Sequence, residues 1–418
     1  MLKLLETAHQ DDSHRPVLED LARVGAQKML MAALEAEVAE YIGAHQDQRD
    51  ESGHALVTRN GRARARKIVT GTGVLDVEAP RVNDRRVDSE GNRSRFTSKI
   101  LPPYMRRSPK VDEVLPILYL RGLSSGDFSE ALPALLGEDA AGLSASTITR
   151  LTNQWSSEYD SYRRRDLSHS DYVYVWCDGI HVRIRLEDEK LCLLVMLGVR
   201  PDGTKELIAV EDGYRESKES WLSVLRDLNK RGMKAPVVAV GDSALGFWAA
   251  LSEVWPDTRE QRCWFHRLGN ILDKLPKRLQ GRAKDAVHEI VWAETKAEAE
   301  AATEAFESEY GAKYPRAVAS LLRDHEKSLT FYDFPAEHWR HLRTTNLIES
   351  PFATVRLRQR VTKGAGSRTK GLTMTYKLLE MAQKRWHRIN GAHLLALVAA
   401  GVVFRDGVQQ EDKEDRAA

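Results

Sequence analysis

The chain has 418 residues, 42% of them hydrophobic and 30% charged, with a formal net charge of +2. This length allows several domains with apolar cores, and no run of about 18 apolar residues predicts a membrane span. The N-terminal segment lacks the long apolar stretch of a secretory signal, so we expect none. The three cysteines, Cys177, Cys192 and Cys263, lie in apolar stretches without a disulfide pattern, which favours a reducing cytoplasmic setting.

The small net charge conceals strong charge patterning along the chain. Residues 58–110 carry 14 Lys/Arg against 5 Asp/Glu, and residues 340–390 carry 12 against 2. Residues 285–330 have the opposite balance, with 5 basic and 10 acidic residues. Two basic blocks around a nearly neutral middle favour a polyanionic partner over a merely solvated surface, and we expect double-stranded DNA.

The N-terminal part predicts a helix followed by a basic β-ribbon or loop. Residues 16–43 carry apolar side chains at helical spacing. Two short strand-like pieces, Lys67–Thr70 and Val74–Ala79, follow between glycines, and residues 83–98 are polar and predict a linker. The basic side chains expected to contact DNA here are Arg62, Arg64, Arg66 and Lys67.

Residues 109–155 predict three short helices, the first ending at Gly122 and the last beginning near Ser144. This arrangement is typical of a helix-turn-helix, whose last helix enters the DNA major groove. An ordinary three-helix packing unit fits the same pattern. The last helix offers phosphate and base-edge contacts at Thr147, Thr149, Arg150 and Asn153.

The middle of the chain predicts an α/β sheet. Three strands joined by turns are followed by a helix, a strand, a helix and a strand, which is the ribonuclease-H-like order. These predicted elements are residues 172–186, 191–199, 205–211, 217–231, 236–242, 245–255 and 258–265. Beyond them, residues 267–340 and 346–388 are expected to be helical, the latter basic, with a final apolar helix at 393–403.

Three acidic residues occupy settings typical of a metal site. Asp178 lies in the first predicted strand, Asp242 ends the adjacent apolar strand, and Glu349 begins a later basic helix. Converging carboxylates hold divalent metal for phosphodiester chemistry, so we expect Mg²⁺, with Mn²⁺ as a substitute. Taken singly, Asp178 could form a turn, Asp242 could cap a helix, and Glu349 could be a first-turn glutamate.

The segment around Glu349 poses a backbone question. Pro351 removes a hydrogen bond if the helix begins at Asn346, so either the helix begins at Ser350 or Glu349 lies in an irregular first turn. The basic residues expected to hold DNA phosphate beside the metals are Arg356, Arg358, Arg360, Lys363 and Arg368. The Gly-rich segment 363–371 does not match a phosphate-binding P-loop, so nucleotide hydrolysis is not implied.

Several segments together resemble the Mutator-type family of bacterial insertion-sequence DDE transposases. They are DGIHVRI, GDSALGFWAAL, QRCWFHRLGNIL and TTNLIESPFATVRLR, with RNGRARARKIVTGTGVLDVEAPRV and SASTITRL upstream. The resemblance covers about residues 15–405. It implies a ribonuclease-H-like core with Asp178, Asp242 and Glu349 as catalytic metal ligands, a characteristic Cys-x₂-His pair at Cys263 and His266, and a bacterial, nucleoid-associated setting.

The pair of Cys263 and His266 also has an interpretation from its chemistry. Cys-x₂-His is half of a zinc site, and Cys177 and Cys192 lie inside strands, so we expect no zinc. His266 could be a catalytic group that contacts the scissile phosphate or orients a carboxylate, with Cys263 supporting it. A packed cysteine beside a hydrogen-bonded histidine fits equally well.

These observations predict six regions and one combined function. The regions are 1–108 (N-terminal helix and basic ribbon or linker), 109–165 (helix-turn-helix-like), 166–266 (first part of the ribonuclease-H-like core), 267–340 (helical insertion), 341–405 (C-terminal core helices with a basic face) and 406–418 (disordered tail). We expect a homodimeric DNA transposase that binds terminal inverted repeats, cleaves a strand to expose a 3′-hydroxyl and transfers it. The alternatives are a DNA-binding regulator without catalysis and a nuclease of this fold that cuts without joining.

Overall fold

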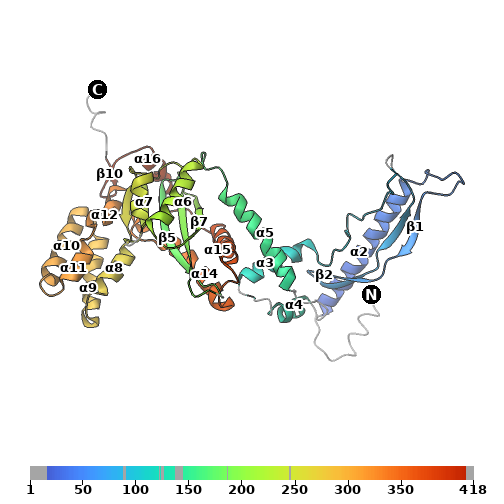
Figure 1. Cartoon of the computed structure of the whole chain (residues 1–418), viewed down its shortest axis with the longest axis horizontal. Coiled ribbons are helices and arrows are strands. Elements are labelled where there is room, and N and C mark those ends of the chain that lie inside the picture. The colour runs from blue at the N-terminus through green and yellow to red at the C-terminus, as the bar shows by residue number, and fades with distance from the viewer. Residues whose placement is uncertain are drawn as a thin grey trace, which may run out of the picture. The chain divides into compact units, whose positions relative to one another are not determined.

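The computed structural model describes residues 17–87, 91–121, 123, 127–136, 145–185, 187–243 and 246–410, without the side chains of 17, 129, 145–149, 151 and 152. The chain divides into two compact units, Met1–Leu151 and Thr152–Ala418 (Figure 1). Helices combine with one mixed five-stranded sheet and smaller antiparallel pairs, which confirms the predicted α/β class. No helix in the described ranges is long and apolar enough to cross a membrane.

The N-terminal unit begins with helix α2 (Val17–Gly43), as predicted, and a basic antiparallel ribbon. The ribbon contains the predicted strands β2 (Arg66–Thr70) and β3 (Gly73–Val77). It is lengthened by β1 (Val57–Arg62) and β4 (Pro80–Asp84), which pair with each other and were not predicted. Their sequences, VTRNGR and PRVND, have little of the apolar alternation that marks a strand.

Apolar contacts hold the ribbon against the helix. Leu34 of α2 belongs to one buried cluster with Ile68, Leu75 and Val77 of the β2–β3 hairpin. Such burial stabilises by about 25 cal/mol per Å² of apolar surface removed from water, which a two-stranded ribbon cannot achieve alone. The ribbon is therefore an ordered element of this unit.

Three further helices follow: α3 (Pro109–Arg121), α4 (Phe128–Leu136) and α5 (Ala145–Arg163). Val111 and Leu115 of α3 pack with residues of α4 and β3 in a second small core. Helix α5 is longer than predicted, and the predicted turn at 142–143 lies outside the described residues. The helix-turn-helix interpretation stays a prediction.

A mixed sheet organises the second unit, with strand order β7-β6-β5-β8-β9. Strand β5 pairs antiparallel with β6 and parallel with β8, and β8 pairs parallel with β9. The strands are β5 (Tyr174–Val182), β6 (Leu191–Val199), β7 (Lys205–Gly213), β8 (Val238–Gly241) and β9 (Arg259–Arg262). The first and last strands end earlier than predicted, because Ile184 forms a separate bridge with Ala365 and Trp264 already begins a helix.

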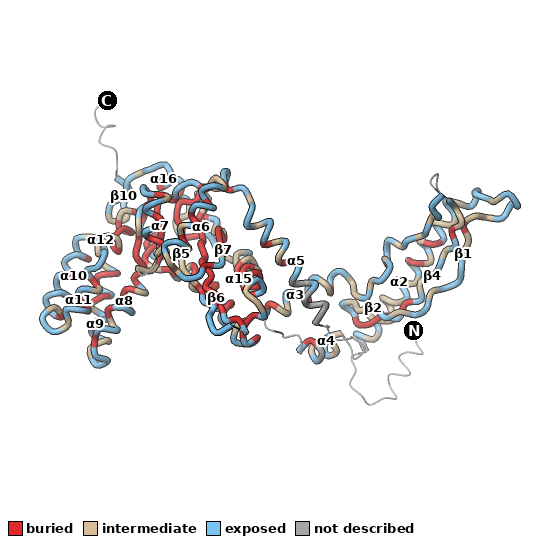
Figure 2. Tube along the Cα trace, in the orientation of Figure 1, coloured by how far each residue is buried: buried red, intermediate tan, exposed pale blue. Residues whose placement is uncertain are grey.

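Helices cover both faces of this sheet. Helices α6 (Lys218–Lys230) and α7 (Phe247–Val254) pack against one face in a shared apolar core. Helices α14 (Asn346–Thr362) and α15 (Arg368–Gln383) contact β5, β6 and β7. All nine residues of β6 are buried, which explains why its sequence is apolar without alternation (Figure 2).

A helical segment separates β9 from α14, as predicted for residues 267–340, but it begins earlier, at Trp264. Its elements are α8 (Trp264–Leu272), α9 (Lys277–Trp292), α10 (Lys296–Tyr310), α11 (Pro315–Leu322), α12 (His325–Ser328), η1 (Thr330–Asp333) and α13 (Ala336–Leu342). The backbone N–H of Trp264 donates to the carbonyl of Arg343 at 2.9 Å. The two ends of the segment therefore meet beside the sheet, although about 80 residues separate them in sequence.

The C-terminal part differs from the expectation of one helix and a disordered tail. A short 3₁₀ turn η2 (Ala392–Leu394) leads into α16 (Leu395–Ala399). Strands β10 (Phe404–Arg405) and β11 (Val408–Gln409) then pair as a small antiparallel hairpin. The expected helix thus stops before Val403, and the hairpin stands where disorder was expected from residue 406.

Candidate active site at the end of the sheet

Asp178 and Asp242 lie at the same level on neighbouring strands. The parallel pairing of β5 with β8 sets Cys177 opposite Gly241, so the next residue on each strand is Asp178 and Asp242. Neighbouring strands lie about 4.8 Å apart. The backbones of Asp178 and Asp242 therefore lie side by side, where β8 ends and β5 continues.

The backbone of Asp242 is fixed, but its carboxylate is incompletely paired. Its carbonyl accepts the indole N–H of Trp248 at 2.6 Å, and the Arg262 guanidinium lies 3.7 Å from the centre of the Trp248 ring. Its Oδ1 is buried and has no hydrogen-bond partner in the described part of the chain. An unsatisfied buried carboxylate oxygen is costly, so a bound cation would be stabilising here.

Asp178 lies in an acidic, largely buried environment. Burial raises the pKa of Asp178 to about 7, although the hydrogen bond from the Gly179 N–H and the charge on His266 lower it. The carboxylates of Glu216 and Glu349 raise this pKa further. The Gly179 N–H donates to Asp178 Oδ1 at 2.8 Å. Several carboxylates thus gather around Asp178.

Glu349 lies in a regular first turn of α14. Its N–H donates to the carbonyl of Thr345 at 3.0 Å, and the Thr345 hydroxyl donates to Glu349 Oε1. Pro351 lies inside the helix, in the second turn, where its missing N–H removes one helical hydrogen bond. Both backbone alternatives considered for this segment are therefore wrong, because α14 begins at Asn346 and its first turn is regular.

His266 reaches the same place from the first turn of α8. The N–H of Cys263 donates to the carbonyl of Gly241 at 2.8 Å, which continues the β8–β9 pairing up to the helix. His266 Nε2 lies 3.8 Å from Glu349 Oε1, and Cys263 Sγ lies 3.2 Å from Thr345 Oγ1. The hydrogen bond with Cys263 raises the pKa of His266 to about 9 despite burial, and the charges on Asp242 and Glu349 raise it further. The imidazolium is therefore a positive charge among carboxylates.

The described ranges contain two groups of possible metal ligands. Within each group, the ligand atoms lie within 4.8 Å of one another. The groups are Cys263–His266–Glu349 and His181–Cys192–Glu216. Asp178, Asp242 and Glu349 do not form such a group. The sequence spacing did not reveal that Glu349 joins Cys263 and His266. Glu216 carries no recognisable motif in the sequence, and only the fold brings it to His181 and Cys192.

The predicted DNA contacts on and after α14 differ in exposure and in ion pairing. Arg356, Arg360 and Lys363 are exposed and form no ion pair within the described residues. Arg358 is only 1% exposed, so its predicted role as a surface contact is wrong for this structure. Arg368 is held by Asp212 at 2.7 Å and by Glu187 at 3.5 Å.

Two of the predicted DNA contacts in the N-terminal ribbon already bind other groups of the chain. Arg62 pairs with Glu35 at 2.9 Å, and Arg66 donates to the carbonyls of Leu101 and Pro102. Among the predicted contacts here and on α5, the exposed residues are Arg62, Arg64, Lys67, Arg150 and Asn153. The side chains of Thr147 and Thr149 lie outside the described residues.

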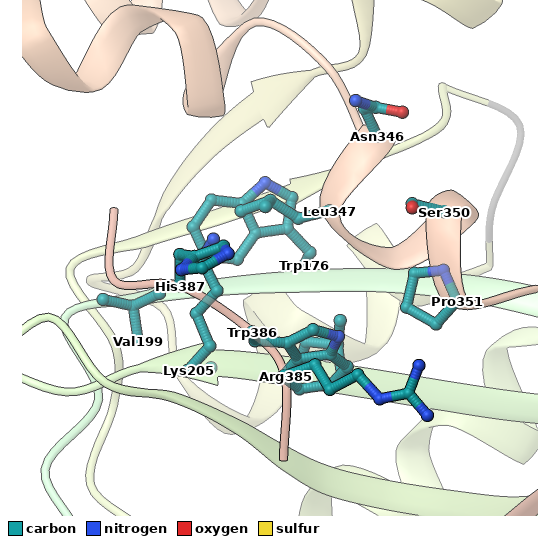
Figure 3. A pocket seen from close by; sticks show the side chains of 12 residues that line it. Trp176, Val199, Lys205, Asn346, Leu347, Ser350, Pro351, Arg385, Trp386 and His387 are labelled. Atoms are coloured by element: carbon teal, nitrogen blue, oxygen red, sulfur yellow. The ribbon is translucent and has the colours of Figure 1, made fainter. Parts of the chain in front are cut away.

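A cavity of about 240 Å³ lies beside the first turns of α14. Its lining includes Asn346, Ser350 and Pro351 of that helix and Arg385 and Trp386 of the segment after α15 (Figure 3). Glu349 is not among its lining residues. The cavity is therefore separate from the carboxylate cluster.

Comparison with known proteins identifies the family. The sequence matches the family described as "Transposase, Mutator family" over residues 2–388. It is 60% identical over 297 residues to the transposase for insertion sequence element IS6120 of Mycolicibacterium smegmatis, covering 71% of this chain and 92% of that protein. It is 49% identical over 280 residues to the transposase for IST2 of Acidithiobacillus ferrooxidans, covering 67% and 95%. The chain belongs to the Mutator family of transposases.

A more distant relative extends the match along the chain. The transposase for IS256 in transposon Tn4001 of Staphylococcus aureus is 26% identical over 349 residues. That alignment covers 82% of this chain and 85% of the relative. The similarity therefore includes both compact units.

Proposed function

We propose that this chain is a DNA transposase that cleaves a DNA strand to expose a 3′-hydroxyl and then joins that end to other DNA. The observation that carries the proposal is the strand register that sets Asp178 beside Asp242. The sheet order β7-β6-β5-β8-β9, with helices on both faces, supports a ribonuclease-H-like core. Helix α14 contacts β5 and supplies Glu349.

The side chains at this place fit hard divalent cations. Asp178, Asp242 and Glu349 offer oxygen donors, which Mg²⁺ and Mn²⁺ prefer, and the buried Oδ1 of Asp242 lacks a partner among the described residues. When bound, such cations activate the attacking hydroxyl and stabilise the leaving oxygen. The three carboxylates would hold them.

Thr345 and His266 position the third carboxylate. The Thr345 hydroxyl holds one Glu349 oxygen, and His266 lies close to the same oxygen. This fixes the rotamer of Glu349 before substrate arrives, because two groups from different helices limit its movement. Cys263 supports Thr345 through its sulfur, which lies 3.2 Å from the Thr345 hydroxyl and accepts the Thr345 N–H.

The remaining parts would bind DNA. The exposed cations Arg356, Arg360 and Lys363 follow Glu349 on one helix and its C-terminal end, so they are suited to the phosphates beside the cleaved bond. The basic N-terminal unit would recognise the terminal inverted repeats. Two ends must be brought together, so a homodimer is the proposed working unit.

The test is Mg²⁺-dependent cleavage and strand transfer of inverted-repeat DNA by the full chain and by Asp242→Asn. Glu253→Gln, at a surface carboxylate paired with Lys218, is the matched control. We expect products from the wild type and the control and a loss of about a thousandfold in Asp242→Asn, since metal stabilisation of several kcal/mol is removed. Equal rates in all three proteins would reject the site.

The same assay separates the alternative functions. Cleavage without joined products would favour a nuclease of this fold. Specific binding of inverted repeats without cleavage by the wild type would favour a regulator.

A further inference from the structure

We propose that His181, Cys192 and Glu216 form a second metal site, which takes Zn²⁺ and is separate from the carboxylates proposed to hold Mg²⁺. The three residues offer an imidazole nitrogen, a sulfur and a carboxylate oxygen, and these ligand atoms all lie within 4.8 Å of one another. Zinc readily takes imidazole and thiolate ligands, whereas Mg²⁺ takes oxygen. Such a site would bind its ion whether or not the chain cleaves DNA.

Two of the ligands form a cross-strand pair. The antiparallel pairing of β5 with β6 sets His181 directly opposite Cys192. Side chains of directly opposite residues share one face of a sheet, with their Cβ atoms about 4.5–5.5 Å apart, so both can bind one ion. Cys192 belongs to the apolar core beneath α6 and α7, so this is the face that those two helices cover.

The third ligand, Glu216, lies over the same face of β5. It directly precedes Ser217, which caps α6. A Cβ built on Gly179 would overlap the Glu216 carboxylate, so the missing side chain leaves the space that this carboxylate occupies. Side chains alternate along a strand, so Gly179 faces the same way as His181 and opposite to Asp178. The proposed zinc site therefore lies on the other face of the sheet from the Asp178 side chain.

The separation of His181 and Glu216 suits a shared ion better than a direct bond. His181 Nδ1 lies 3.9 Å from Glu216 Oε1. That is beyond the about 3.2 Å of an N–H···O hydrogen bond, whereas two such ligands of a tetrahedral zinc ion lie about 3.4 Å apart. The His181 side chain is 51% exposed, so water can take the fourth ligand position. An ion pair this exposed would itself contribute little stability.

The Cys192 thiol must lose its proton to bind zinc, which is a cost of this site. Burial raises the pKa of the thiol to about 12, so the sulfur is protonated at neutral pH in the absence of an ion. Binding forms the zinc–sulfur bond and releases the proton to solvent, so zinc affinity should fall as the pH falls.

The sequence led us to expect no zinc, because Cys192 lies inside a predicted strand. Only the strand pairing and the connection before α6 bring His181 and Glu216 to it. A bound ion would join β5, β6 and the start of α6, so its role would be structural.

The experiment measures metal binding by the full chain, without an affinity tag and stripped of metal by a chelator. Zn²⁺ affinity is measured by competition with a chromophoric chelator. Co²⁺ serves as a spectroscopic substitute, because its charge-transfer band reports a bound thiolate. The variants are Cys192→Ser, His181→Ala and Glu216→Gln. The matched controls are His169→Ala, at an exposed histidine, and Glu253→Gln, at a surface carboxylate.

We expect each of the three variants to weaken Zn²⁺ binding about a hundredfold or more, since even the loss of an outer-shell partner costs about 10–100-fold. The controls should match the wild type, and Cys192→Ser should lose the cobalt–thiolate band. His181→Ala changes a half-exposed side chain, so it should fold even if Cys192→Ser does not. Unchanged affinity in His181→Ala or Glu216→Gln, or no cobalt–thiolate band in the wild type, overturns the proposal.

The other group of possible ligands, Cys263–His266–Glu349, needs a control of its own because it also contains a cysteine. Cys263→Ser should keep the cobalt–thiolate band if the ion binds Cys192. A band that is lost in Cys263→Ser and kept in Cys192→Ser would place the ion in the other group, and the proposal would be wrong.

Discussion

Two aspartates, the buried Asp84 in one unit and the half-buried Asp242 in the other, show opposite uses of charge. Asp84 of β4 accepts hydrogen bonds from the Arg86 side chain at 2.7 and 2.9 Å and from the Tyr41 hydroxyl at 2.6 Å. Asp242 has one buried oxygen that finds no partner in the described ranges. The Asp84 carboxylate is hydrogen-bonded by Arg86 and Tyr41, whereas one oxygen of Asp242 has no hydrogen-bond partner among the residues that the structure describes.

The basic side chains show the same contrast. In the N-terminal ribbon, Arg59 and Arg62 both pair with Glu35. On α14, Arg356 and Arg360 are exposed without an ion pair among the described residues. Counting charges along the sequence cannot separate these cases, because an arginine in an ion pair and an arginine open to a partner count the same.

The largest expected effect comes from the incomplete carboxylate. Asp242→Asn should lower DNA cleavage about a thousandfold yet leave the free energy of unfolding unchanged or raised, because it removes the charge of a half-buried carboxylate, one oxygen of which has no partner among the described residues. Cleavage rates and urea denaturation of the same preparation test this. A loss of stability comparable to the loss of activity would mean that Asp242 is structural, like Asp84.

How much of this site the sequence predicts depends on the kind of signal. Asp178 and Asp242 follow apolar runs that mark neighbouring strands, so their placement side by side was predictable. Glu216 carries no such signal, because only the fold brings it to His181 and Cys192.

Arg358 was predictable from helix phase. It lies three residues after the buried Val355 and four before the buried Thr362, so it belongs to the inward face of α14. Arg356 and Arg360 lie on a different face. The sequence prediction failed here because it grouped the arginines by charge alone.

The second expected effect is a loss of stability, from the aspartate whose hydrogen bonds the fold satisfies. Asp84→Asn should lower the free energy of unfolding by about 2–3 kcal/mol, since it breaks a buried, fully hydrogen-bonded ion pair. The hydrogen bonds from Arg86 hold the pKa of Asp84 far below its ordinary value of 3.8. The folded state therefore binds this proton less readily than the unfolded state, and the stabilisation is present above a pH of about 4 and lost as the pH falls further.

Denaturation of the wild type and Asp84→Asn between neutral and acidic pH measures this difference. The two curves should converge on acidification. Asp50→Asn is a suitable control, because Asp50 is a more exposed carboxylate of the same unit that pairs with Arg85 at 3.5 Å. A difference that persists at low pH would indicate that packing rather than charge is lost.

The smallest expected effect compares two arginines. Arg360→Ala should lower the slope of log affinity against log salt for DNA by about one unit, because one phosphate contact releases about one counterion. Arg62→Ala should change the slope less, since Glu35 already neutralises that guanidinium. Titration of double-stranded DNA at several salt concentrations measures both slopes. Equal slope changes would show that the Glu35 pair opens on DNA, and an unchanged slope in Arg360→Ala would place that face of α14 away from the phosphates.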